Sequence, residues 1–170
     1  MDLKLFAVTA ALLLASPAMA KDADDCLPGL ICASAPDTVA KAVQTAGYKA
    51  KLGKDDGGDP KIDSAAAGYD FQIYFYDCEN HVQCGSIQFV ITFTREGYED
   101  ATLAEQWNES SRMGKAYLEK DGSLTVRHDI STVGGINQKN FEDTINWWST
   151  VLGDVAEFWK KHPNPKKTKA

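Results

Sequence analysis

The sequence predicts an α+β domain in which helices pack on one face of an antiparallel β-sheet. Residues 69–76 and 86–93 alternate apolar and polar side chains, as half-buried strands do, and Asp121-Gly122 is a strong hairpin-turn signal. Residues 138–161 carry a continuous apolar stripe at helical spacing. With 170 residues, 44% of them hydrophobic and 25% charged, the composition is that of one folded domain and excludes a disordered or fibrous protein.

The first 20 residues have the pattern of a secretory signal peptide. Lys4 supplies a basic start, Leu5–Ala15 an apolar run, and Ala18-Met19-Ala20 a cleavage site of small residues. The run is shorter than the roughly 20 apolar residues that a membrane helix needs, so no transmembrane segment is expected. We therefore predict export to the periplasm and a mature chain that starts near Lys21.

Acidic residues dominate the body of the chain. Residues 21–159 contain 12 basic and 23 acidic side chains, and such a body repels phosphate backbones. No nucleic-acid partner is therefore expected. Lysines without any acid follow at positions 160, 161, 166, 167 and 169, and residues 162–170 are interpreted as a basic flexible tail.

The four cysteines fall into two close pairs. Cys26 and Cys32 are separated by five residues, and so are Cys78 and Cys84. Four cysteines allow three pairings, and this spacing favours the two local disulfides in an oxidising compartment. Residues 21–36 would then form an N-terminal loop that contains the first disulfide.

The two aromatic strands indicate a hairpin whose register also brings the second cysteine pair together. That register pairs Phe75 with Ile87, Ile73 with Phe89, Phe71 with Ile91, and Tyr69 with Phe93. It sets Cys78 opposite Cys84, where a disulfide would contribute about 2 kcal/mol. The alternative is a zinc site formed by these two cysteines and His81. Because an exported chain meets oxidants, we expect no metal and no cofactor.

The segment before this hairpin predicts one short helix and two strands. Asp37 can cap a helix that ends at Gly47, and residues 48–52 and 61–66 have the pattern of strands. The apolar face of this helix consists of Val39, Ala40, Val43 and Ala46. Residues 55–59 are rich in Asp but lack the Gly and Glu positions of a calcium-binding EF-hand loop, so they are interpreted as a solvated turn.

After the hairpin, the sequence predicts a second helix and a second hairpin. Thr102 can cap the helix, with Glu105 completing a capping box. The hairpin joins residues 115–120 to residues 123–130 across Asp121-Gly122. His128 shares the apolar face of its strand, so we expect it to pack and not to catalyse.

The last helix is predicted from Gln138 to Lys161, with Asn137 as its cap. Its stripe consists of Phe141, Ile145, Trp148, Leu152, Val155 and Trp159, and Trp147, Val151 and Phe158 widen it. The predicted order is thus helix, four strands, helix, two strands and long helix.

No catalytic constellation is found, so no enzyme is predicted. The three histidines lie in a loop, on an apolar strand face and in the tail, and no nucleophile-elbow or phosphate-loop spacing occurs. Glu105 and Glu109 are one helical turn apart, which is typical of a solvated helix face.

Two surfaces carry more apolar area than packing requires. The candidate binding face lies on the polar side of the aromatic hairpin and consists of Gln72, Tyr74, Tyr76, Gln88 and Val90. The candidate dimer or ligand surface lies on the last helix and consists of Trp147, Trp148, Val151 and Phe158. Tyr beside small polar residues suits recognition, so we expect an exported protein partner or a second copy of the chain. The alternative is a small apolar ligand held between the last helix and the sheet by Trp148 and Phe89.

Several segments resemble, in the same order, the YbjN family of bacterial sensory transduction regulators. They are Phe71-Gln72-Ile73-Tyr74-Phe75-Tyr76 with Cys78, Ser86-Ile87-Gln88-Phe89, Trp107-Asn108, Gly114-Lys115-Ala116-Tyr117-Leu118, Asn140-Phe141-Glu142-Asp143-Thr144, and Trp147-Trp148. The resemblance places the family domain at residues 37–161. It implies a fold similar to type III secretion chaperones, which are typically dimers, and it implies no catalytic residues.

Overall fold

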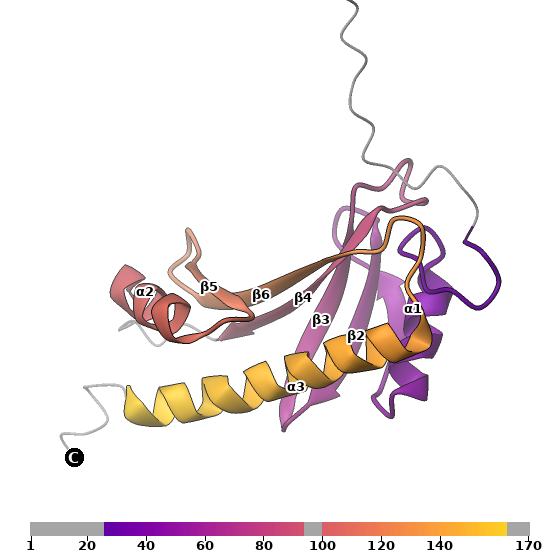
Figure 1. Ribbon diagram of the computed structural model, residues 1–170. Coiled ribbons are helices and arrows are strands. Elements are labelled where there is room, and N and C mark those ends of the chain that lie inside the picture. The colour runs from indigo at the N-terminus through magenta and orange to yellow at the C-terminus, as the bar shows by residue number, and fades with distance from the viewer. Residues whose placement is uncertain (1–25, 94–99, 163–170) are drawn as a thin grey trace, which may run out of the picture.

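Six antiparallel strands form one sheet, and three helices accompany it, in the computed structural model that describes residues 26–93 and 100–162 (Figure 1). The elements, in chain order, are α1 (Pro36–Thr45), β1 (Lys51–Lys54), β2 (Pro60–Ala66), β3 (Tyr69–Tyr76), β4 (Ser86–Phe93), α2 (Ala101–Ser110), β5 (Lys115–Leu118), β6 (Leu124–Ser131) and α3 (Gln138–Lys161). The predicted α+β class and element order are confirmed. The predicted signal peptide and residues 163–170 of the predicted tail lie outside the described residues.

The strands are arranged in the order β1-β2-β3-β4-β6-β5. The second strand of the last hairpin therefore lies inside the sheet and the first lies at its edge. Burial gives the reason, since Leu124, Thr125 and Val126 of β6 are buried, whereas in β5 only Ala116 is buried. An inner strand needs a longer buried segment than an edge strand, and β6 provides it.

The predicted register of the β3–β4 hairpin is confirmed. Phe75 lies opposite Ile87, and Ile73 lies opposite Phe89. Both predicted cysteine pairs lie at disulfide-bond distance, with Sγ–Sγ distances of 2.13 Å for Cys26–Cys32 and 2.07 Å for Cys78–Cys84. Among the described residues, no group of three His, Cys, Asp or Glu side chains is placed to hold a metal ion.

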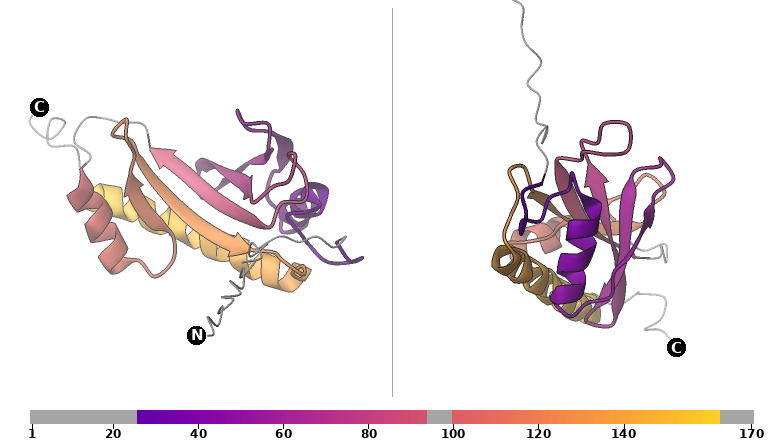
Figure 2. Two further views of the ribbon diagram at one scale, coloured as in Figure 1. Left: turned by 90° about the horizontal axis from the view of Figure 1, so that it is seen from above. Right: turned by 90° about the vertical axis from the view of Figure 1, so that its right-hand side faces the viewer.

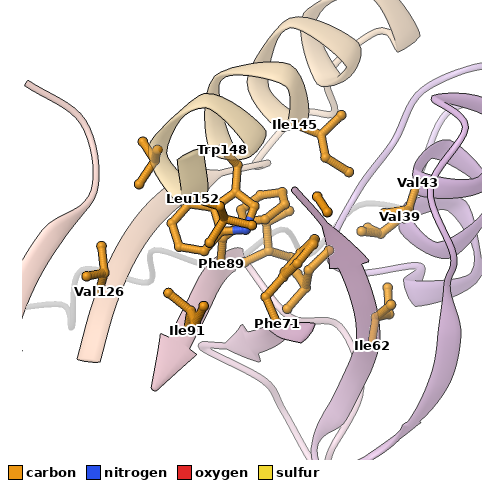
Figure 3. Packing of buried hydrophobic residues seen from close by; sticks show 14 of the residues in the cluster. Val39, Val43, Ile62, Phe71, Phe89, Ile91, Val126, Ile145, Trp148 and Leu152 are labelled. Carbon is orange, nitrogen blue, oxygen red and sulfur yellow. The ribbon is translucent and has the colours of Figure 1, made fainter. Parts of the chain in front are cut away.

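One face of the sheet is covered by α1 and α3, as the views in Figures 1 and 2 show. The aromatic ring of Trp148 on α3 lies 5.8 Å from that of Phe71 and 5.7 Å from that of Phe89, measured between centroids. Figure 3 shows Val39 and Val43 of α1 beside this cluster. The core thus lies mainly between the sheet and these two helices, and α2, which packs against the edge strand β5, adds Ala104 and Trp107 to it.

The bounds of α3 and its cap are as predicted. The carboxamide oxygen of Asn137 accepts a hydrogen bond from the backbone N–H of Asn140 at 2.9 Å. Within the described ranges, neither this helix nor another has the length and apolar character needed to cross a bilayer.

The predicted caps of the two shorter helices are wrong. Ala35 occupies the N-cap position of α1, so Asp37 lies inside the first turn and caps nothing. Pro36 explains the start, because a proline at the first helical position has no N–H to leave unpaired. Asp100 and not Thr102 caps α2, accepting from the N–H of Leu103 at 3.1 Å. In both helices the N-cap lies two residues before the polar residue that the pattern favours.

The first strand begins later than predicted. Tyr48 still donates its N–H to the carbonyl of Val43 at the end of α1, and β1 starts only at Lys51. Gly47, at φ +90°, allows this turn because glycine adopts the left-handed conformation without a steric penalty.

Candidate interaction surfaces

The face of the sheet opposite the helices gathers four of the five residues of the candidate binding face. Because Phe71, Ile73 and Phe75 point into the core, the alternate residues of β3 point away from it. A hollow of about 530 Å³, here called the outer hollow, is lined on this side by Tyr74, Tyr76, Gln88 and Val90. Gln72, opposite Val90, lies on the same face beside the hollow.

The β5–β6 hairpin supplies the other wall of the outer hollow. Arg127 lies opposite Val90 on the neighbouring strand, and its guanidinium donates to Glu119 Oε1 at 2.5 Å. The same guanidinium lies 5.3 Å from the ring centroid of Tyr117, a cation–π contact. Sequence reasoning missed this wall, because Arg127 joins the face only when β6 is placed beside β4.

Hydrogen bonds between side chains orient the polar groups of this face. The hydroxyl of Tyr76 donates to Gln88 Oε1 at 3.3 Å, and Gln88 Nε2 donates to Asp129 Oδ1 at 2.6 Å. Burial raises the pKa of Tyr76, and the positive charge of Arg127 offsets part of that effect. The tyrosine is therefore a neutral donor throughout the physiological pH range. These side chains present a fixed set of rings, amides and one cation.

A second hollow lies between α2 and the C-terminal half of α3. This hollow of about 690 Å³, here called the helix groove, is lined by Trp147, Val151 and Phe158 together with residues that include Arg112 and Met113. The ring of Trp147 is 42% exposed, and the Arg112 guanidinium lies 5.4 Å from its centroid. Three of the four residues of the candidate dimer or ligand surface are thus brought together here.

Trp148, the fourth residue predicted for the dimer or ligand surface, does not belong to it. It is fully buried in the core, because consecutive residues of a helix point about 100° apart and only one of two neighbouring Trp side chains can face the sheet. Phe89, named with Trp148 as the lining of a ligand space, is also fully buried. The two rings contact each other and fill the space between them (Figure 3).

The three histidines lie in separate places. His81 bonds Asp59 through Nδ1 at 2.8 Å, and His162 stacks on Phe158 with 4.2 Å between centroids. His128 is half-buried on β6, as expected for a packing residue, and this burial lowers its pKa. Glu105 and Glu109 are exposed on α2, in keeping with a solvated helix face.

Comparisons with known proteins agree with this fold. The sequence profile of the YbjN family, described as "Putative bacterial sensory transduction regulator", matches residues 35–158. The crystal structure of YbjN from E. coli is similar with a TM-score of 0.58 and 18% sequence identity, covering 78% of this chain and 96% of that chain. No curated protein gives a significant match. The structural similarity is one of fold.

Proposed function

Because the chain belongs to the YbjN family, we propose that it is an exported regulatory protein of this family that binds a protein partner at the outer hollow. The observation that carries the proposal is the convergence of Tyr74, Tyr76, Gln88 and Val90 with Arg127 around one hollow. The family is named for regulation and not for catalysis, which agrees with a binding role.

The chemistry of the outer hollow suits a protein surface. Val90, at 7% exposure, gives an apolar floor, and the two tyrosines add ring area with hydroxyl groups at the tips. Arg and Tyr are enriched among the residues that dominate binding energy in protein interfaces. Hydrogen bonds already hold Tyr76, Gln88 and Arg127, so little conformational entropy is lost when a partner binds.

The test compares partner capture by matched variants. The wild-type chain, the double variant Tyr74→Ala/Tyr76→Ala and the control Trp147→Ala are cross-linked in a periplasmic extract, and the bound proteins are quantified. We expect the tyrosine variant to lose the partner and the control, which changes the helix groove, to keep it. Equal capture by all three chains would remove the outer hollow as the binding surface.

Export is supported by the apolar N-terminal pattern and by the two cysteine pairs at bonding distance. Cell fractionation with N-terminal sequencing tests it. A periplasmic chain that begins at Lys21 is expected. A cytoplasmic chain that retains residues 1–20 would contradict export while leaving the binding proposal open to its own test.

A second candidate function is the binding of a small apolar ligand, or of a second copy, in the helix groove. It is favoured by the exposed ring of Trp147 beside Val151 and Phe158. Native mass spectrometry and light scattering of the mature chain distinguish ligand, dimer and bare monomer. A thermal shift with hydrophobic dyes that disappears in Trp147→Ala would support the ligand.

A further inference from the structure

The two edge strands of the sheet differ in how far the neighbouring helices cover their outer backbone groups. On β5, the side-chain amide of Asn108 pairs with both backbone groups of Ala116, so α2 blocks this edge. On β1, Gln44 of α1 donates to the carbonyl of Ala50 at 3.3 Å, before the strand begins. The outer side of β1 itself has no such cover among the described residues.

The backbone groups that β1 leaves unpaired follow from its register. Asp55 donates its N–H to the carbonyl of Asp59, which makes this a hydrogen-bonded pair at the end of the β1–β2 ladder. In an antiparallel ladder, hydrogen-bonded pairs alternate with pairs that are not hydrogen-bonded. Gly53 and Lys51 therefore also bond β2, whereas Leu52 and Lys54 direct their backbone N–H and C=O groups away from β2. Pro60, which has no N–H, lies opposite Lys54 and agrees with this assignment.

This edge is open to an approaching chain. Every residue of β1 is exposed. Leu52 adds an apolar side chain that is 37% exposed. The N–H and C=O groups of two residues are therefore available for strand addition, a mode in which main-chain bonds give affinity and side chains give specificity.

The charges at the edge indicate the kind of chain that fits. Lys49, Lys51 and Lys54 are exposed, and no acidic side chain of the described residues pairs with them. This basic strand stands out on a chain whose residues 21–159 are strongly acidic. An added strand that carries Asp and Glu would place opposite charges beside these lysines, and such cross-strand pairs are stabilising.

We propose that the β1 edge binds an extended acidic segment of another protein, which adds to the sheet beside β1. This surface is separate from the outer hollow, which lies on β3, β4, β6 and the β5–β6 turn. The backbone groups of Leu52 and Lys54 hold the added segment, and the three lysines select Asp and Glu side chains along it.

The test uses the mature chain and three ten-residue peptides with blocked termini, here called probes. In them Val alternates with Glu, with Gln or with Lys. Titration is followed by calorimetry and by the amide resonances of Leu52 and Lys54. We expect the Glu probe to bind and to shift both resonances. At low salt its affinity should be about tenfold or more above that of the Gln probe, and this difference should become smaller at high salt. The Lys probe should not bind.

Matched variants separate strand addition from simple charge attraction. Leu52→Pro removes an outward N–H without removing a hydrogen bond to β2, so this variant should no longer bind the Glu probe. Leu52→Ala keeps the N–H and should still bind the probe. The triple variant Lys49→Gln/Lys51→Gln/Lys54→Gln should bind weakly, and a control with the same charge change elsewhere, Lys120→Gln/Lys139→Gln/Lys161→Gln, should bind normally. Circular dichroism confirms that each variant is folded.

Three results would overturn the proposal. They are no binding of the Glu probe, unchanged binding by Leu52→Pro, and resonance shifts confined to residues of the outer hollow. If the lysines serve only to prevent other strands from pairing with this edge, the Glu probe will not bind. Tyr74→Ala/Tyr76→Ala should leave probe binding unchanged, so failure at the β1 edge is distinguishable from failure at the outer hollow.

Discussion

The side-chain amide of Asn108 pairs with Ala116 as a neighbouring strand would. Its Oδ1 accepts from the backbone N–H of Ala116 at 2.8 Å, and its Nδ2 donates to the carbonyl at 3.0 Å. The indole of Trp107 donates to the carbonyl of Gly114 at 2.6 Å. The Trp107-Asn108 and Gly114–Leu118 segments, which are part of the family resemblance, thus act together to fix α2 against the edge strand.

Removing this amide should destabilise the domain. We expect Asn108→Ala to lower the free energy of unfolding by about 1–3 kcal/mol, because it leaves a partly buried N–H and C=O of Ala116 without partners. Asn108→Asp should also destabilise the domain, because it keeps the acceptor but sets a carboxylate oxygen against the carbonyl oxygen of Ala116. Urea denaturation measures all three. Gln106→Ala, on the exposed side of α2, is the control and should change stability by less than about 0.5 kcal/mol.

The two neighbouring tryptophans of α3 should differ sharply in their effect on stability. Trp148→Ala removes a fully buried ring from the centre of the core and should cost about 3–5 kcal/mol. Trp147→Ala removes a ring that is largely outside the core, and its effect should stay below about 1 kcal/mol. Chemical denaturation followed by circular dichroism compares them. Similar losses for both would mean that the helix is rotated relative to the sheet.

The Cys78–Cys84 disulfide should make the free energy of unfolding depend on whether the protein is oxidised or reduced. We expect Cys78→Ala/Cys84→Ala to lower the free energy of unfolding by about 2 kcal/mol under oxidising conditions, because the unfolded chain gains freedom. Under a strong reductant, the difference between wild type and variant should shrink. Peptide mapping without reduction should recover this pair and Cys26–Cys32 as linked peptides. Free thiols, or linkage between the two pairs, would contradict the assignment.

Protonation of His128 should destabilise the folded state in mild acid. Burial lowers its pKa below the value of about 6.5 in the unfolded chain, so the unfolded state binds the proton more tightly. The contribution of neutral His128 is therefore fully present above pH 6.5 and is lost as the pH falls from there towards the folded-state pKa. Unfolding measured between about pH 7.5 and 5.5 should show this loss, and His128→Gln should remove it. An equal slope in the variant would assign the effect to another group.

Local patterns in the sequence were sufficient where neighbouring residues fix the geometry. The alternation of residues 69–76 and 86–93 excludes any register shifted by one residue, because that shift would expose the apolar side chains, and the structure has the predicted register. The same loop length brings Cys78 to Cys84. The bounds of α3 follow from Asn137 and from an apolar stripe that continues for the whole helix.

The helix starts were harder to predict because several residues compete for each cap. Asp100 and Thr102 are both good N-caps, and in the structure Asp100 has that role. At α1, Pro36 sets the first turn and leaves Asp37 without a capping role. Such choices depend on small energy differences, which tertiary contacts override.

Local sequence patterns were enough to predict the class of fold, the order of its elements, the pairing within the aromatic hairpin and the extent of the last helix, because each depends on periodicity or on residues close in the chain. Tertiary structure alone decided that β6 lies between β4 and β5, that Arg127 completes the outer hollow, and that Trp148 is buried while Trp147 is exposed. These features depend on which strands and helices meet across long separations in the chain. Burial of the whole apolar surface selects that arrangement, and no local pattern encodes it.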